Sequence, residues 1–74
     1  SLGLAPVIVD DVFDVIHNIN TVKKLPVILV EQNAYMALSI SNRCYVLENG
    51  RIAHSGKSSE LIQSDVIRET YLGG

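Results

Sequence analysis

One stretch of the chain, residues 26–34, most constrains what the sequence can fold into. It reads Pro-Val-Ile-Leu-Val-Glu-Gln-Asn-Ala, so an aliphatic run leads directly into a polar corner. A uniformly aliphatic, largely β-branched run is typical of an interior strand in a parallel sheet, which is covered on both faces. Open α/β sheets bind ligands outside the carboxyl ends of their strands, so Glu31-Gln32-Asn33 is a candidate site.

The side chains of this corner limit the chemistry that it can perform. Gln32 does not titrate and cannot act as a general acid or base, but its amide donates and accepts hydrogen bonds. Such a group suits orienting a water molecule or gripping a phosphate oxygen. Glu31 could serve as a base, although the sequence indicates no partner for it. The simpler alternative is a polar turn in which Asn33 caps the next helix. The residues alone leave both alternatives open.

Length and composition limit the classes of protein to consider. The chain has 74 residues, 47% of them hydrophobic and 5% aromatic, which indicates one small α/β domain near the lower size limit for independent folding. A net charge of −2 with scattered basic residues argues against a nucleic-acid partner. The single cysteine, Cys44, excludes an internal disulfide. No apolar run approaches the roughly 20 residues of a membrane-spanning helix.

Periodicity and turn signals predict one folding unit over residues 1–74. Pro6 suits the first position of a helix, and Asn49-Gly50 predicts a two-residue type I′ hairpin turn. Gly56 is expected to end the second strand of that hairpin. The expected elements are a helix at 6–20, a strand at 27–30, a helix after Asn33, strands at 44–47 and 52–54, and helices at 58–63 and 65–71. An apolar stripe on the first helix comprises Val9, Val12, Phe13, Ile16 and Ile19.

The remaining polar residues favour structural roles over a metal site. His17 and His54 stand alone, and neither shows the spacing of metal ligands. Asp10, Asp11 and Asp14 suggest either a cation site or a solvated face near the positive end of a helix dipole. The dipole is the simpler explanation. We therefore expect no bound metal.

Four short motifs, taken together, resemble a known family over essentially the whole chain. They are Ser-Leu-Gly-Leu-Ala-Pro at 1–6, Leu-Val-Glu-Gln-Asn-Ala at 29–34, Tyr-Val-Leu-Glu-Asn-Gly-Arg-Ile at 45–52 and Tyr-Leu-Gly-Gly at 71–74. In this order they resemble the C-terminal part of an ABC transporter ATP-binding subunit of the branched-chain amino acid, LivF-type family. The resemblance implies an α/β fold: part of a P-loop ATPase domain with parallel strands, a β-hairpin and terminal helices.

The resemblance also assigns two candidate functional segments. Residues 1–6 match the D-loop, which contacts the opposite subunit of a nucleotide-sandwich dimer. The D-loop contact residues are Leu2, Gly3, Leu4 and Ala5. Residues 31–33 match the switch loop, and Gln32 falls where most ABC ATPases carry a histidine that contacts the γ-phosphate. Ala5 stands where an aspartate is usual. Both departures resemble the branched-chain subfamily itself.

The parent protein implied by this resemblance is an ATPase on the cytoplasmic face of the membrane. It would use ATP and Mg²⁺, and its partners would be a second ATP-binding subunit and membrane permease subunits. This chain lacks the Walker A loop, the signature motif and the Walker B strand with its catalytic glutamate, which supply most of the stabilisation in phosphoryl transfer. We therefore expect the chain alone neither to bind nor to hydrolyse ATP.

A different class of function is a stand-alone α/β interaction or dimerisation module. The missing initiator methionine counts against it and suggests that the chain begins inside a longer protein. A glycine-rich phosphate loop encoded roughly 150 residues upstream would favour the ATPase. In either case, unpaired strand edges and apolar faces predict that the chain self-associates.

Overall fold

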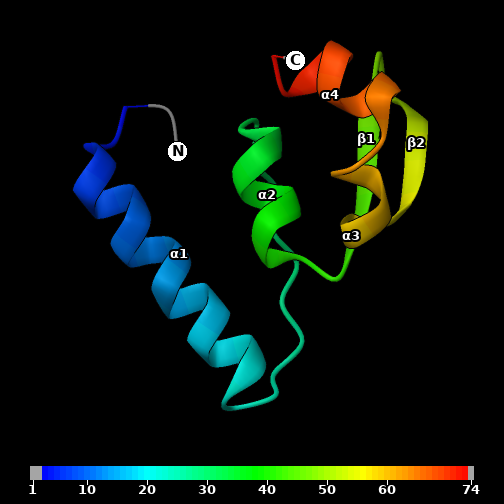
Figure 1. Cartoon of the computed structure of the whole chain (residues 1–74). Helices are drawn as coiled ribbons and strands as arrows, with labels where there is room; N and C mark the ends of the chain where they lie inside the picture. The colour runs from blue at the N-terminus through cyan, green and yellow to red at the C-terminus, as the bar shows by residue number, and fades with distance from the viewer. Residues whose placement is uncertain (1–2, 74) are drawn as a thin grey trace. The chain divides into compact units, whose positions relative to one another are not determined.

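The computed structural model describes residues 3–73, which form four helices and one two-stranded sheet (Figure 1). The elements are α1 (Pro6–Thr21), α2 (Ala34–Ile40), β1 (Arg43–Glu48), β2 (Arg51–Lys57), α3 (Ser58–Leu61) and α4 (Asp65–Tyr71). Contacts group the chain into two compact units, one ending at Gln32 and the other beginning at Asn33. A single folding unit over all 74 residues therefore stays a prediction.

The first unit contains α1, which confirms the helix predicted from the apolar stripe. The helix begins at Pro6, where the missing N–H leaves no helical hydrogen bond unmade. Val9 and Phe13 are its buried residues, whereas Val12 remains 43% exposed. Val12 belongs instead to a shallow apolar depression with Ile8 and other residues of the same helix. The helix is therefore apolar on more than the one predicted stripe.

The predicted interior strand at Val27–Val30 is not formed in this structure. No regular secondary structure is assigned between the end of α1 and the start of α2. The side chains of Ile28 and Val30 are 95% and 93% exposed. A strand is stable only when its backbone groups pair with a neighbouring strand. Among residues 3–73 the sheet contains only the antiparallel strands β1 and β2, so this segment is unpaired and no parallel pair is present there.

The second unit is built around an antiparallel hairpin, as the Asn49-Gly50 signal predicts. Both turn residues have positive φ, 51° at Asn49 and 75° at Gly50, as a type I′ turn requires. The register is irregular between Val46 and Leu47. Because Val46 pairs with His54 and Leu47 with Ile52, the residue between these two partners forms a β-bulge.

The prediction that Gly56 ends the second strand is wrong. Gly56 pairs with Cys44, and β2 continues to Lys57. A glycine supplies the same backbone hydrogen-bonding groups as any other residue, so it weakens a strand without necessarily ending it. A Cβ atom at position 56 would lie 3.9 Å from Cγ of Leu61. Gly56 therefore lies next to α3, and a Cβ atom there would be in ordinary van der Waals contact with Leu61.

Side-chain oxygens cap two of the helices in the second unit. Oδ1 of Asn33 accepts a hydrogen bond of 3.2 Å from the backbone N–H of Met36 at the start of α2. Oγ of Ser64 accepts one of 3.4 Å from the N–H of Ile67 at the start of α4. These bonds satisfy backbone donors that have no partner within a helix. The predicted capping role of Asn33 is confirmed.

The core of the second unit is small and includes a buried serine. Leu38 of α2 is 4% exposed, and Ile67 of α4 is 1% exposed. Ser58, at the start of α3, is 1% exposed and lies 2.6 Å from Ser41, measured between the Oγ atoms. The N–H of Ser58 also donates to the carbonyl oxygen of Asn42 at 3.0 Å. This polar pair links the end of α2 to α3, and α3 in turn contacts both strands.

Candidate functional site

The polar corner falls at the boundary between the two units. The backbone bends at Gln32, the last residue of the first unit. The side chain of Gln32 is exposed and forms no hydrogen bond or ion pair within residues 3–73. Asn33, the first residue of the second unit, caps α2. The corner therefore performs the simpler role of a helix cap through Asn33, while Gln32 has its amide donor and acceptor open to solvent.

The D-loop segment lies immediately before α1. Leu2 lies outside the described residues. Gly3 has a φ of 86°, a left-handed conformation that favours glycine, and Leu4 is 50% exposed. Ala5 occupies the N-cap position, where its carbonyl oxygen accepts 3.0 Å hydrogen bonds from the N–H groups of Ile8 and Val9. Its methyl side chain supplies no cap. No hydrogen bond joins residues 3–5 to Gln32 in the described part of the chain.

The acidic residues of α1 do not complement the helix dipole as expected. The first turn of α1 contains no acidic residue. The dipole effect falls off within that turn, so the dipole part of the explanation given for Asp10, Asp11 and Asp14 is wrong, whereas the solvated face is confirmed. All three are exposed. Within residues 3–73, no group of His, Cys, Asp and Glu side chains could hold a metal ion.

Two ionisable groups of the hairpin region have pKa values displaced by their surroundings. The Glu48 carboxylate raises the pKa of the Tyr71 hydroxyl, chiefly as a hydrogen-bond acceptor and further through its charge, and burial adds to the effect. The hydroxyl is shielded from solvent, yet no contact to it reaches full hydrogen-bond geometry. The Glu48 carboxylate thus lies near the Tyr71 hydroxyl without forming a full hydrogen bond to it. Burial raises the pKa of the Cys44 thiol. Both groups remain protonated near neutral pH.

His54 contributes to packing at the same end of the hairpin. Its ring meets that of Tyr71 edge-on, with the centroids 5.7 Å apart and the planes at 79°. This is a favoured geometry for two aromatic rings. It joins β2 to α4, which is a structural role of the kind expected for His54.

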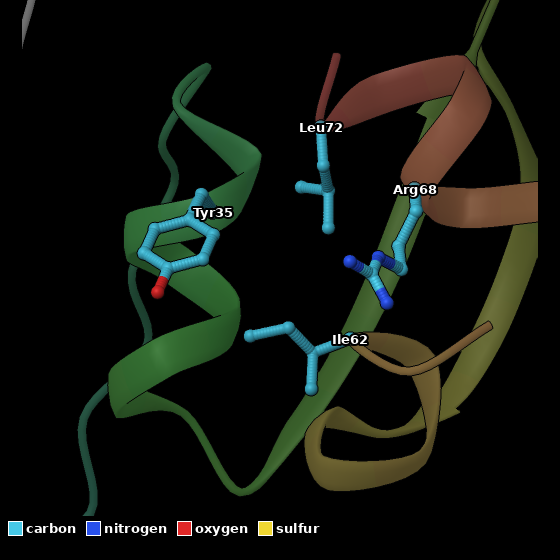
Figure 2. A pocket seen from close by; sticks show the side chains of 4 residues that line it. All are labelled: Tyr35, Ile62, Arg68 and Leu72. Carbon is cyan, nitrogen blue, oxygen red and sulfur yellow. The ribbon is translucent and has the colours of Figure 1, made fainter. Parts of the chain in front are cut away.

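A pocket that the sequence did not predict lies within the second unit (Figure 2). It is open to solvent, has a volume of about 280 Å³ and is lined by Tyr35, Ile62, Arg68 and Leu72. These residues come from the start of α2, the turn after α3, and α4 with its C-cap. They lie up to 37 positions apart in the sequence, the distance from Tyr35 to Leu72. No local motif marks such a set, because only the packing of these helices brings it together.

Comparison with known proteins supports the resemblance carried by the four motifs. The chain is 45% identical over 74 residues to the high-affinity branched-chain amino acid transport ATP-binding protein BraG of Pseudomonas aeruginosa. It is 36% identical over 70 residues to the probable branched-chain amino acid transport ATP-binding protein LivF of Archaeoglobus fulgidus. Over its whole length the chain is therefore similar to ATP-binding proteins of branched-chain amino acid ABC transporters.

The similarity covers the whole chain but only part of each relative. The BraG match takes in 100% of this chain and 31% of BraG, and the LivF match takes in 95% of the chain and 30% of LivF. A more distant relative is the lipopolysaccharide export system ATP-binding protein LptB of Acidithiobacillus ferridurans, 25% identical over 71 residues, which are 96% of the chain and 29% of LptB. No protein-family model matches the chain. In the described residues, no helix is long and apolar enough to cross a membrane.

Proposed function

We propose that this chain is part of the ATP-binding subunit of an ABC transporter that imports branched-chain amino acids. The observation that carries the proposal is the 45% identity to BraG over all 74 residues. In the proposed protein the chain is the C-terminal part of the ATPase domain. The complete subunit binds and hydrolyses ATP at the cytoplasmic face of the membrane, together with a second ATP-binding subunit and permease subunits.

The exposed Val27–Val30 segment supports a larger parent domain. Ile28 and Val30 expose almost their entire side chains, which is costly for aliphatic residues. We propose that in the complete subunit this segment is an interior strand that pairs in parallel with strands from elsewhere in the domain. Pairing would cover both faces of the segment and satisfy its backbone groups. It would also place Gln32 at the carboxyl end of a sheet strand, where α/β proteins bind ligands.

In this proposal, Gln32 positions a reactant during ATP hydrolysis. Its exposed amide can donate to a γ-phosphate oxygen and accept from the attacking water. Because the amide does not titrate, Gln32 orients and polarises without moving a proton. The complete subunit would use Mg²⁺ together with ATP. Leu2 to Ala5 would contact the opposite subunit, without the side-chain hydrogen bond that an aspartate at position 5 could make.

The proposed role of Gln32 is tested by substitution in the complete subunit assembled with its permease. Gln32→Ala should lower kcat for ATP hydrolysis by about a hundredfold, because a positioning group is lost. The affinity of the Gln32→Ala variant for ATP should change little. Gln32→His should keep most of the activity. Gln63→Ala, which changes an exposed glutamine outside the site, serves as the matched control. Wild-type turnover by Gln32→Ala would exclude the role.

The chain alone provides a second test of the same proposal. Without a phosphate-binding loop it should show no magnesium-dependent ATP turnover above background. The measurement is phosphate release by the purified chain, compared with the complete subunit. Turnover by the chain alone would show that its own residues form an active site and would contradict the proposed division of roles.

A further inference from the structure

The pocket of the second unit combines one cation with aliphatic walls. Figure 2 shows the Arg68 guanidinium directed into the space between α2 and α4, with the side chains of Ile62 and Leu72 beside it. The ring of Tyr35 borders the space from α2. Ile62 and Leu72 are half-buried, so their aliphatic surface is fixed by packing. This arrangement presents a positive charge next to apolar surface.

Arg68 is the only charged residue that lines the pocket. Among residues 3–73, the Arg68 side chain forms no ion pair and no hydrogen bond. None of the four lining residues carries a carboxylate. A guanidinium has five N–H donors in a planar fork that matches a carboxylate group in two parallel hydrogen bonds. The pocket therefore offers an unused recognition group for an anion.

We propose that this pocket binds a small aliphatic monocarboxylate. The carboxylate would pair with Arg68, and the aliphatic chain would lie against Ile62 and Leu72. A volume of about 280 Å³ is at the lower end for ligand sites, which fits a ligand of fewer than about ten non-hydrogen atoms. None of the lining residues is negatively charged and Arg68 repels an ammonium group, so a free amino acid should bind less well than the corresponding acid. The proposal does not depend on the ATPase assignment.

The affinity should be modest, because the pocket is small and Arg68 is exposed to water. Part of the gain from the ion pair is lost to solvent screening, and binding must also overcome the entropy of association. We expect a Kd on the order of 1 mM for a ligand of this size.

The first experiment compares ligands on the unaltered chain by two-dimensional NMR, with 4-methylpentanoate as the probe. The NMR chemical shifts of Tyr35, Ile62, Arg68 and Leu72 should change with ligand concentration and reach saturation. The neutral 4-methylpentanamide should bind at least tenfold more weakly because it lacks the charge. Acetate should also bind about tenfold more weakly because it lacks the aliphatic chain. Leucine, which has the ammonium group, should bind more weakly than 4-methylpentanoate.

The second experiment substitutes the cation. Arg68→Gln should raise the Kd for 4-methylpentanoate about tenfold, since a charge-assisted pair is lost. Arg68→Lys, which keeps a point charge without the planar fork, should give an intermediate value. Arg51→Gln removes an exposed arginine of the hairpin and should leave the Kd unchanged. Equal binding of acid and amide, unchanged affinity of Arg68→Gln, or shifts confined to other residues would each overturn the proposal. If Arg68→Gln does not fold, the comparison of acid with amide decides.

Discussion

At the scale of single residues, Ala5 and Gln32 show how local position shapes a candidate role. Ala5 has the extended φ and ψ of an N-cap, −64° and 146°, but no side-chain oxygen to accept a hydrogen bond. Gln32 has hydrogen-bonding groups without a partner among residues 3–73. Ala5 thus has the backbone geometry of an N-cap but no side-chain acceptor. Gln32 has an amide donor and acceptor to which no other group among residues 3–73 forms a hydrogen bond.

An aspartate at position 5 should stabilise α1. The backbone already has N-cap geometry, and an aspartate would accept a hydrogen bond from the first turn and favour the positive end of the helix. Ala5→Asp should therefore raise the free energy of unfolding by about 1 kcal/mol. Urea denaturation followed by far-UV circular dichroism measures the change. Ala5→Leu has no oxygen acceptor and should give no gain. An equal gain for both variants would show that capping is not the cause.

At the scale of elements, the hairpin is determined locally and the predicted interior strand is not. The Asn49-Gly50 turn is specified by its own two residues, because both tolerate positive φ. Val27–Val30 has strong strand propensity, yet in this structure it has no strand. Neither strand of the hairpin pairs with it. Strand propensity reports how well side chains fit a pleated, covered surface, and such a surface needs neighbours.

Gly50→Ala should destabilise the hairpin through the backbone alone. Gly50 has a φ of 75°, and a Cβ atom there would meet no other heavy atom within 4 Å. The left-handed conformation should therefore cost roughly 1–2 kcal/mol for alanine. Gly50→Asn should cost less, because asparagine tolerates this conformation. Chemical denaturation of both variants checks the prediction. A loss for asparagine as large as that for alanine would indicate that backbone conformation is not the cause.

At the scale of the whole molecule, a large part of the apolar surface is uncovered. Ile28 and Val30 are almost fully exposed, and Val7 and Val15 of α1 are 67% and 57% exposed. Exposed apolar segments and unpaired backbone groups favour association with further chains. Either the rest of the proposed ATPase domain or a second copy of the chain would cover this surface.

The chain alone should self-associate through the Val27–Val30 segment. Sedimentation velocity should show dimers or larger species that increase with concentration. The double variant Ile28→Glu/Val30→Glu should shift the population to monomer, because charges would disfavour burial of the segment. Both side chains are exposed, so their loss should not unfold either unit.

A control with the same added charge separates this effect from general repulsion. Gln63→Glu/Thr70→Glu changes two exposed polar positions in the second unit and should leave association unchanged. A wild-type chain that stays folded and monomeric at all concentrations would contradict the prediction. Equal dissociation of both double variants would show that net charge, and not this segment, controls association.

The sequence by itself determined the local elements and the resemblance to ABC transporter ATP-binding proteins. The first helix, the capped helix after Asn33, the type I′ turn and the last helix follow from interactions between residues close in the chain. The tertiary structure decided which apolar residues are buried and showed that β2 continues through Gly56. It also left Val27–Val30 unpaired and assembled the pocket around Arg68. The reason is physical: caps and turns depend on a few neighbouring residues, whereas burial, strand pairing and pockets depend on which distant segments meet.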